Sequence, residues 1–143
     1  MLPITGIELI ALIPQKPPFV MIDTLITTDG IRCTTAFTIL ADNVLCDDGK
    51  LNPSGLLENI AQTAAVMSGY SLKMENKERL AGFIGNIRDF AWTQLPAIGD
   101  EIITEVTLDN KVFDVTIITG RIKLGTEEIA SCNMKIFKAI KND

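Results

Sequence analysis

The sequence has no histidine, only three cysteines, and aromatic side chains at just 6 % of its residues. The three cysteines, Cys33, Cys46 and Cys132, are far apart in the chain. Without histidine they offer no spacing typical of a metal site. We therefore predict neither a metal nor a cofactor. An odd number of separated cysteines is expected to stay as reduced, buried thiols in a cytoplasmic protein.

The sequence also lacks a long apolar run and a basic cluster. No stretch approaches the roughly 20 apolar residues that a membrane span requires. The N-terminal segment has no basic start, so we interpret it as part of the domain rather than as a signal peptide. Lysine and arginine number 13 against 18 acidic residues, giving a formal charge of -5, and the basic residues are scattered. Binding to nucleic acid or to a membrane is therefore not expected.

What the sequence does have is apolar residues, at 47 % of 143 positions. That content predicts one domain, residues 1–143, with a substantial core and enough apolar side chains for a subunit interface. Periodicity and turn signals predict two helices, a short one over residues 5–13 and a long one from Asn52 to about residue 73. Between them they predict a hairpin over 19–26 and 31–40 and a polar connection over 41–51. After the long helix they predict strands over 80–92, 101–108, 112–124 and 128–137, with a turn at Asp109 and Asn110. This order favours an α+β architecture with one helix packed on an antiparallel sheet.

The long helix contains one acidic residue in its most apolar part. The segment NPSGLLENIAQTAAVMSGY, residues 52–70, has Glu58 and no basic residue. At about 100° per residue, the stripe that holds this acid consists of Gly55, Glu58, Gln62, Ala65 and Gly69. Mostly small side chains beside Glu58 leave room for a ligand or another chain. Gln62, one turn further on, can donate a hydrogen bond that orients the carboxylate.

Two roles are open for Glu58. Burial is costly for an unpaired carboxylate and favours its neutral form, which would make the residue a proton donor. Alternatively, Glu58 lies at the helix edge or pairs with Gln62 and an arginine such as Arg88, with no role beyond structure. The start of the helix, at Ser54 and Gly55, presents N–H groups that can polarise a carbonyl oxygen. Its plainer interpretation is an ordinary capped helix.

Three stretches in matching order resemble the hot-dog-fold β-hydroxyacyl-ACP dehydratases, most closely their divergent aryl-polyene branch. LIPQKPPFVMIDTL, residues 12–25, is similar to the family's LPHRxPFLLVDRV. ENIAQTAAVMSGY, residues 58–70, is similar to E-x-x-AQ-x-x-x-x-SGW. LAGFIGNIRDFAWTQLPAIGDEI, residues 80–102, is similar to the strand that leads into P-x-GD. The resemblance covers almost the whole chain.

This resemblance implies a hot-dog fold, an antiparallel sheet wrapped around one long central helix. It also implies a dimer whose sheets pair edge to edge, with thioester tunnels at the interface. By match, Glu58 takes the position of the family's catalytic acid, Gln62 its orienting neighbour, and Gly55 a position that binds the thioester carbonyl. Gly55 and Gln62 are thus the expected substrate-binding residues.

The sequence departs from the family because it lacks the family's catalytic histidine. In the family, that histidine removes the α-proton of the substrate. The corresponding segment VLCDDGKLNPSG, residues 44–55, has none, and Gln15 stands where the LPH motif has another histidine. Asp47 or Asp48 could serve as the base instead, although an exposed polar loop is the plainer interpretation.

Three functions therefore remain open. The first is a dehydratase acting on an acyl-ACP or acyl-CoA thioester in fatty-acid or polyene-type biosynthesis. The second is a thioesterase that uses Glu58. The third is a non-catalytic thioester binder that partners an active hot-dog subunit. The expected assembly is a homodimer or higher homo-oligomer, or a heterodimer with another hot-dog chain.

Overall fold

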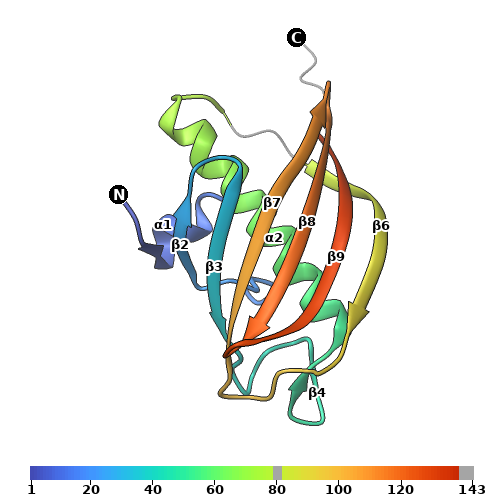
Figure 1. The fold of residues 1–143 in the computed structure, drawn as a ribbon. Coiled ribbons are helices and arrows are strands. Elements are labelled where there is room, and N and C mark those ends of the chain that lie inside the picture. The colour runs from blue at the N-terminus through green and yellow to red at the C-terminus, as the bar shows by residue number, and fades with distance from the viewer. Residues whose placement is uncertain (79–81, 139–143) are drawn as a thin grey trace.

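A computed structural model describes residues 1–78 and 82–138, and most of the described strands join one seven-stranded antiparallel sheet (Figure 1). The strand order is β1-β2-β3-β7-β8-β9-β6. The bounds are β1 (Ile4–Thr5), β2 (Thr24–Thr28), β3 (Arg32–Thr38), β6 (Gly82–Trp92), β7 (Glu101–Val112), β8 (Val115–Leu124) and β9 (Glu127–Lys138). A separate two-stranded ribbon pairs β4 (Cys46–Asp47) with β5 (Lys50–Leu51).

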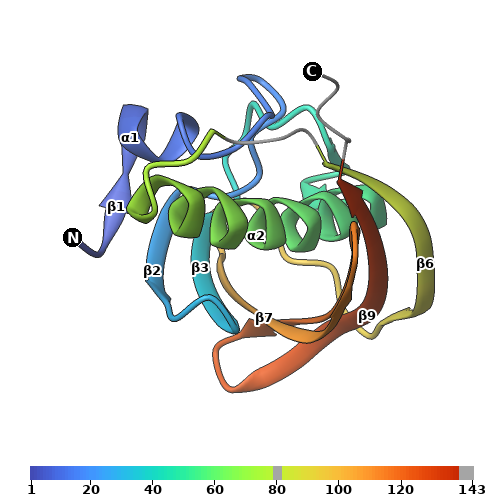
Figure 2. The same cartoon turned by 90° about the horizontal axis from the view of Figure 1, so that it is seen from above.

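The sheet curves around helix α2 (Pro53–Met74), as Figure 2 shows from above. Its 22 residues correspond to roughly 33 Å of helix at 1.5 Å per residue. Asn52 caps it, because its Oδ1 accepts from the Gly55 N–H at 3.0 Å, and Pro53 occupies the first turn, where its lack of an N–H costs nothing. A short helix, α1 (Gly6–Ile10), lies near the N-terminus. In the described part of the chain, neither helix has the length and apolar character needed to cross a bilayer.

The predicted α+β architecture and the long capped helix are confirmed. The predicted strand over 80–92 is present from Gly82, while residues 80 and 81 lie outside the described part. The connection over 41–51 contains the β4–β5 ribbon, which turns at Asp48 and Gly49, both with positive φ. Aspartate and glycine adopt this left-handed backbone more readily than most residues. They explain why a stretch predicted as a plain loop forms a tight turn.

Three predicted boundaries are wrong, each for a local reason. No turn occurs at Asp109, because a bulge between Leu108 and Asn110 absorbs the extra residue and β7 continues to Val112. The first helix begins at Gly6, directly after Thr5, but it ends at Ile10 rather than at residue 13, and the Thr5 side chain makes no capping hydrogen bond. The strand predicted from residue 19 starts at Thr24, because the backbone before it bonds to side chains of α2.

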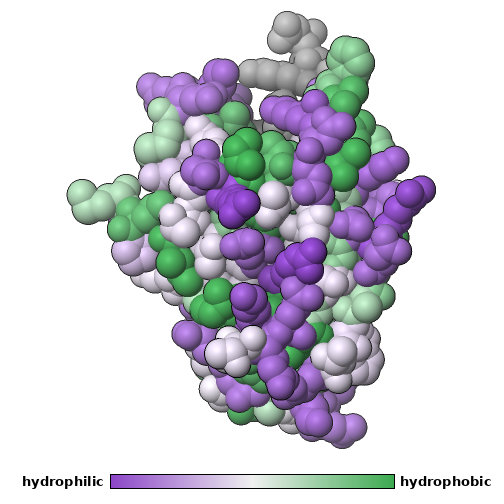
Figure 3. Space-filling model, viewed as in Figure 1, coloured by the Kyte–Doolittle hydropathy of each residue, from purple (hydrophilic) through white to green (hydrophobic). Residues whose placement is uncertain are grey.

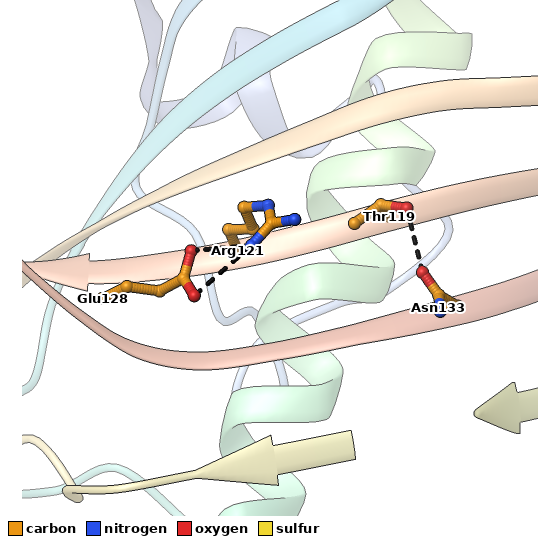
Figure 4. A network of polar contacts seen from close by, with 4 residues as sticks. All are labelled: Thr119, Arg121, Glu128 and Asn133. Atoms are coloured by element: carbon orange, nitrogen blue, oxygen red, sulfur yellow. Dashed lines mark hydrogen bonds and ion pairs between the residues drawn. The ribbon is translucent and has the colours of Figure 1, made fainter. Parts of the chain in front are cut away.

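The two faces of the sheet differ in polarity. The inner face packs on α2 through apolar side chains, and Gly120 on β8 lets Ile60 approach closely: a Cβ there would lie 2.3 Å from the Ile60 Cγ2 atom. Hydrophilic side chains cover much of the outer surface in Figure 3. Figure 4 shows two polar contacts between β8 and β9. They are Thr119 Oγ1 to Asn133 Oδ1 at 2.9 Å and Arg121 Nη1 to Glu128 Oε1 at 3.1 Å. One face is therefore solvated and the other encloses the helix.

Candidate functional site

One side of α2 is closed by a network of buried polar side chains. We call it the closed face and define it by Asn59, Gln62 and Thr63, whose side chains are fully buried. Asn59 Nδ2 donates to the Met21 carbonyl at 2.7 Å, and Asn59 Oδ1 accepts from the Thr104 hydroxyl. The hydroxyl of Thr63 donates to the Asn59 carbonyl at 2.8 Å and lies 2.7 Å from the Thr35 hydroxyl on β3. Every one of these buried groups therefore has a partner, and the network fixes α2 against β3, β7 and the segment before β2.

Gln62 extends this network to Glu58. Its Oε1 accepts from the Met21 N–H at 2.6 Å, and its Nε2 donates to the Phe19 carbonyl at 2.9 Å and to Glu58 Oε2 at 3.0 Å. The predicted hydrogen bond from Gln62 to Glu58 is therefore present. Both amide hydrogens of Gln62 are used in these contacts, which leaves none for a ligand. Substrate binding by Gln62 stays a prediction that this arrangement does not favour.

The opposite side of α2 borders a cavity of about 420 Å³. We call this side the open face and define it by Glu58, Ala61, Ala65 and Ser68, all of which line the cavity. These residues recur every three or four positions, so they share one stripe of the helix. The sheet adds apolar side chains to the wall, among them Ile84, Ile118 and Ile136, and also the polar side chains of Lys111 and Thr116.

Glu58 is the acidic group on the open face. Its side chain is half-buried, and Gln62 holds one of its oxygens. Among the described residues, no hydrogen bond or ion pair reaches the other oxygen, and none links Glu58 to Arg88. A carboxyl group held on one oxygen, with the other unoccupied at a cavity, has the geometry that proton transfer to a bound ligand requires.

The stripe predicted around Glu58 is only partly correct. Ala65 lines the cavity, but Gly69 lies against Leu12, where a Cβ would come within 2.0 Å of the carbonyl oxygen. Gly55 likewise lies against Leu51, whose Cδ1 would be 2.5 Å from a Cβ. These two glycines make room for the protein's own chain rather than for a ligand.

Gly55 also has an occupied amide. Its N–H donates to the carbonyl oxygen of Asn52 at 2.9 Å and to the side-chain oxygen of the same residue at 3.0 Å. A thioester carbonyl would have to displace that cap, and Gly55 is not among the described residues that line the cavity. The carbonyl-binding role of Gly55 stays a prediction.

The two aspartates considered as a base lie elsewhere. Asp47 accepts from Asn52 Nδ2 at 3.1 Å, and Asp48 occupies the turn of the β4–β5 ribbon. Both are exposed and neither lines the cavity. This chain therefore brings no candidate base to Glu58 from that loop.

Sequence reasoning did not select two residues that the structure makes prominent. Asn59 lies at the centre of the closed face, and its signal was a polar residue in an apolar stripe of the helix. Gln15 lines the cavity together with Glu58, although it is 43 positions away in the chain. Only its place in the LPH-like motif marked it, because no local pattern shows which distant loop meets a helix.

The cysteines do not contribute a nucleophile. All three lie in the described ranges and are unpaired. Burial raises the pKa of Cys33 to about 12 and that of Cys132 to about 11. Both thiols therefore stay protonated near neutral pH, as expected of inert core residues.

A family model described as "ApeP-like: ApeP dehydratase" matches residues 7–143. The chain belongs to this ApeP-like family. A search of curated protein sequences finds no match. The resemblance to a divergent dehydratase branch is therefore confirmed at the level of the family.

Solved structures confirm the hot-dog fold. The dehydratase heterocomplex ApeI:P from Xenorhabdus doucetiae matches with a TM-score of 0.86 at 18 % identity, covering 99 % of this chain and 93 % of that one. The protein PH1136 from Pyrococcus horikoshii matches with a TM-score of 0.70 at 10 % identity, covering 99 % and 98 %. The protein smu.793 from Streptococcus mutans, solved with acetyl CoA, matches with a TM-score of 0.64 at 9 % identity, covering 83 % and 90 %. At these identities the likeness concerns the fold.

Proposed function

We propose that the protein is a subunit of a β-hydroxyacyl thioester dehydratase in which Glu58 is the acid, with ACP or CoA as the carrier of the acyl group. The observation that carries this proposal is the position of Glu58, oriented by Gln62 and bordering a cavity of about 420 Å³. The cavity suits an acyl thioester, because apolar side chains such as Ile84, Ile118 and Ile136 alternate in its wall with polar ones such as Ser68 and Thr116.

In the reaction, a base removes the α-proton of the thioester and the new double bond forms as the bond from the β-carbon to oxygen breaks. Protonated Glu58 gives its proton to the departing hydroxyl, which leaves as water. A positioned acid contributes about 10²–10⁴-fold to the rate of such a step. Gln62 keeps the carboxyl group aimed by holding Oε2, so that Oε1 faces the ligand.

The base is proposed to come from a second hot-dog subunit. This chain has no histidine, so a second copy would bring none, whereas a different hot-dog chain can. Strand β6 offers the place for such a partner, since it is the last strand of the sheet and exposes Phe83, Ile87 and Trp92. An apolar edge strand with unpaired backbone groups is well suited to pairing with another sheet. The heterocomplex among the solved structures supports this arrangement.

The test is enoyl formation from a β-hydroxyacyl thioester, followed by absorbance. The protein is assayed alone and with a histidine-bearing hot-dog subunit from an ApeP-like system. We expect turnover only in the mixture, and a loss of at least about 100-fold with Glu58→Gln. Glu105→Gln, which changes an exposed carboxylate on β7, serves as the matched control. Full turnover of the Glu58→Gln mixture would contradict the proposal.

A thioesterase is the second candidate, because a carboxylate at an apolar cavity can activate water without histidine. Thiol release from an acyl-CoA by the protein alone, abolished in Glu58→Gln, would favour it over the dehydratase. Thiol release that persists in that variant would exclude Glu58 from the thioesterase mechanism.

A further inference from the structure

Met21 precedes β2 and is held by two side chains of α2. Its N–H donates to Gln62 Oε1 at 2.6 Å, and its carbonyl oxygen accepts from Asn59 Nδ2 at 2.7 Å. Hydrogen bonding between this segment and β3 begins at Asp23, whose N–H donates to the Ala36 carbonyl at 2.9 Å. Both backbone polar groups of Met21 are therefore fixed by the helix rather than by a neighbouring strand.

These contacts decide which end of the Gln62 amide faces Glu58. The Met21 N–H is a donor, so it takes Oε1, whereas the Phe19 carbonyl is an acceptor and takes Nε2. The second hydrogen of Nε2 is then directed at Glu58 Oε2, at 3.0 Å. With the amide turned over, two donors would meet at Met21, and oxygen would face oxygen at both Phe19 and Glu58. The backbone of residues 19–21 therefore determines the hydrogen bond that Glu58 receives.

Asn59 links this backbone to the sheet. Its side chain is fully buried, and its Oδ1 accepts from the Thr104 hydroxyl on β7, which fixes the orientation of its amide. Among the described residues, the remaining polar contact of Met21 is a weak one, from Asn43 Nδ2 to its thioether sulfur at 3.3 Å. Apart from Gln62 itself, Asn59 is thus the main polar support of Met21.

We infer that Asn59 is a positioning residue that aims Glu58 in the proposed reaction. It acts at a distance, through Met21 and Gln62, and the inference rests on the proposed function. Asn59 is not among the described residues that line the cavity, so it takes no part in binding the substrate. Since Gln62 donates to Oε2, the proton of the neutral acid resides on Oε1, and a shift of Met21 turns that oxygen away from the β-hydroxyl. A misplacement of about 1 Å can lower the rate of a catalysed step about 100-fold.

The first test compares kcat and KM for enoyl formation in the mixture with a histidine-bearing hot-dog subunit. We expect Asn59→Leu to lower kcat about tenfold and to leave KM within about twofold, because the substrate binds as before but meets a misaligned acid. Thr35→Val is the matched control, since it removes a hydroxyl of the same buried network whose partner is Thr63. The control should leave both constants unchanged. Equal losses of kcat in the two variants would indicate a general loosening of the helix and would overturn the inference.

The second test is a double-mutant cycle with Glu58→Gln, which separates positioning from a purely structural role. Because Asn59 acts through the acid, Asn59→Leu should change kcat by less than about twofold once the acid is replaced. A tenfold loss in both backgrounds would overturn the inference while the proposed function stands. Full turnover of Glu58→Gln, or no turnover of the wild-type mixture, would remove the proposed function and the inference together.

A second variant, Asn59→Ala, guards against a leucine side chain that prevents folding. Circular dichroism and binding to the hot-dog partner report whether each variant is folded. The alanine variant should show the same loss of kcat at nearly constant KM, and the same lack of effect beside Glu58→Gln. If neither variant folds, Asn59 is a structural residue and the inference falls.

Discussion

The closed and open faces of α2 belong to the same helix but differ in whether their polar side chains have hydrogen-bond partners. On the closed face, Asn59, Gln62 and Thr63 are fully buried, and their side chains all have partners. On the open face, small side chains border a cavity, and one oxygen of Glu58 has no partner in the described chain. Satisfied polar groups rigidify a structure, whereas unsatisfied ones beside a cavity are typical of binding sites. The comparison teaches that the closed face holds the helix in place so that the open face can receive a ligand.

The largest expected effect is at Gly69→Ala, where α2 packs against the loop that holds Leu12. The added Cβ would lie 2.0 Å from the Leu12 carbonyl oxygen, which is backbone and cannot turn aside. We expect the free energy of unfolding to fall by about 3 kcal/mol, measured by urea denaturation. Ser68→Ala on the open face is the control and should change it by less than about 0.5 kcal/mol. Equal stability of the two variants would remove the distinction between the part of α2 that packs and the part that borders the cavity.

A smaller loss is expected for Asn59→Leu, which leaves the Met21 carbonyl and the Thr104 hydroxyl without their partner. We expect about 2 kcal/mol of destabilisation from these unsatisfied groups. Adding Thr104→Val should restore part of it, because one of the orphaned groups is then removed. Strictly additive losses in this double-mutant cycle would show that the two residues do not act as a unit.

The edge of the sheet beyond the open face should tolerate charge in the isolated protein. Ile87 on β6 is 40 % exposed, so Ile87→Lys should alter the unfolding free energy by less than about 0.5 kcal/mol. The same change should weaken association with a hot-dog partner, measured by analytical ultracentrifugation. Ile31→Lys, at an exposed position next to β3, is the control. Unchanged association of the Ile87 variant would place the partner elsewhere.

The smallest effect is expected on the outer face of the sheet, which belongs to neither side of α2. Arg121 and Glu128 form an exposed ion pair between β8 and β9. Arg121→Ala should lower stability by no more than about 0.5 kcal/mol, and less in high salt. A loss as large as that at Asn59 would mean that the outer face contributes to holding the sheet on α2.

Much of this fold follows from local sequence patterns. The capped helix begins where Asn52 and Pro53 predict, and alternation predicts the late strands, because cap chemistry and period-two burial are properties of short segments. The bulge that carries β7 past Asp109 was not predicted, since a bulge depends on its partner strand rather than on its own residues.

The candidate site was predictable only in part. Glu58 stood out as the single acid in an apolar helix, and its hydrogen bond to Gln62 follows from helical spacing. Helical spacing could not predict which small residues of the helix pack against the chain and which line the cavity, because Gly69 meets a loop 57 positions earlier in the chain. Gln15 reaches the cavity through the same loop, which helical periodicity does not describe.

The most direct test of the open face is the affinity of an acyl-pantetheine thioether for Ala65→Leu. Ala65 is half-buried and lines the cavity, so a larger side chain there fills the proposed binding space without disturbing the closed face. We predict that calorimetry will show at least about tenfold weaker binding than the wild type, with a free energy of unfolding that is nearly the same. Unchanged affinity in a variant whose cavity is filled would contradict the assignment of the thioester to this face of α2.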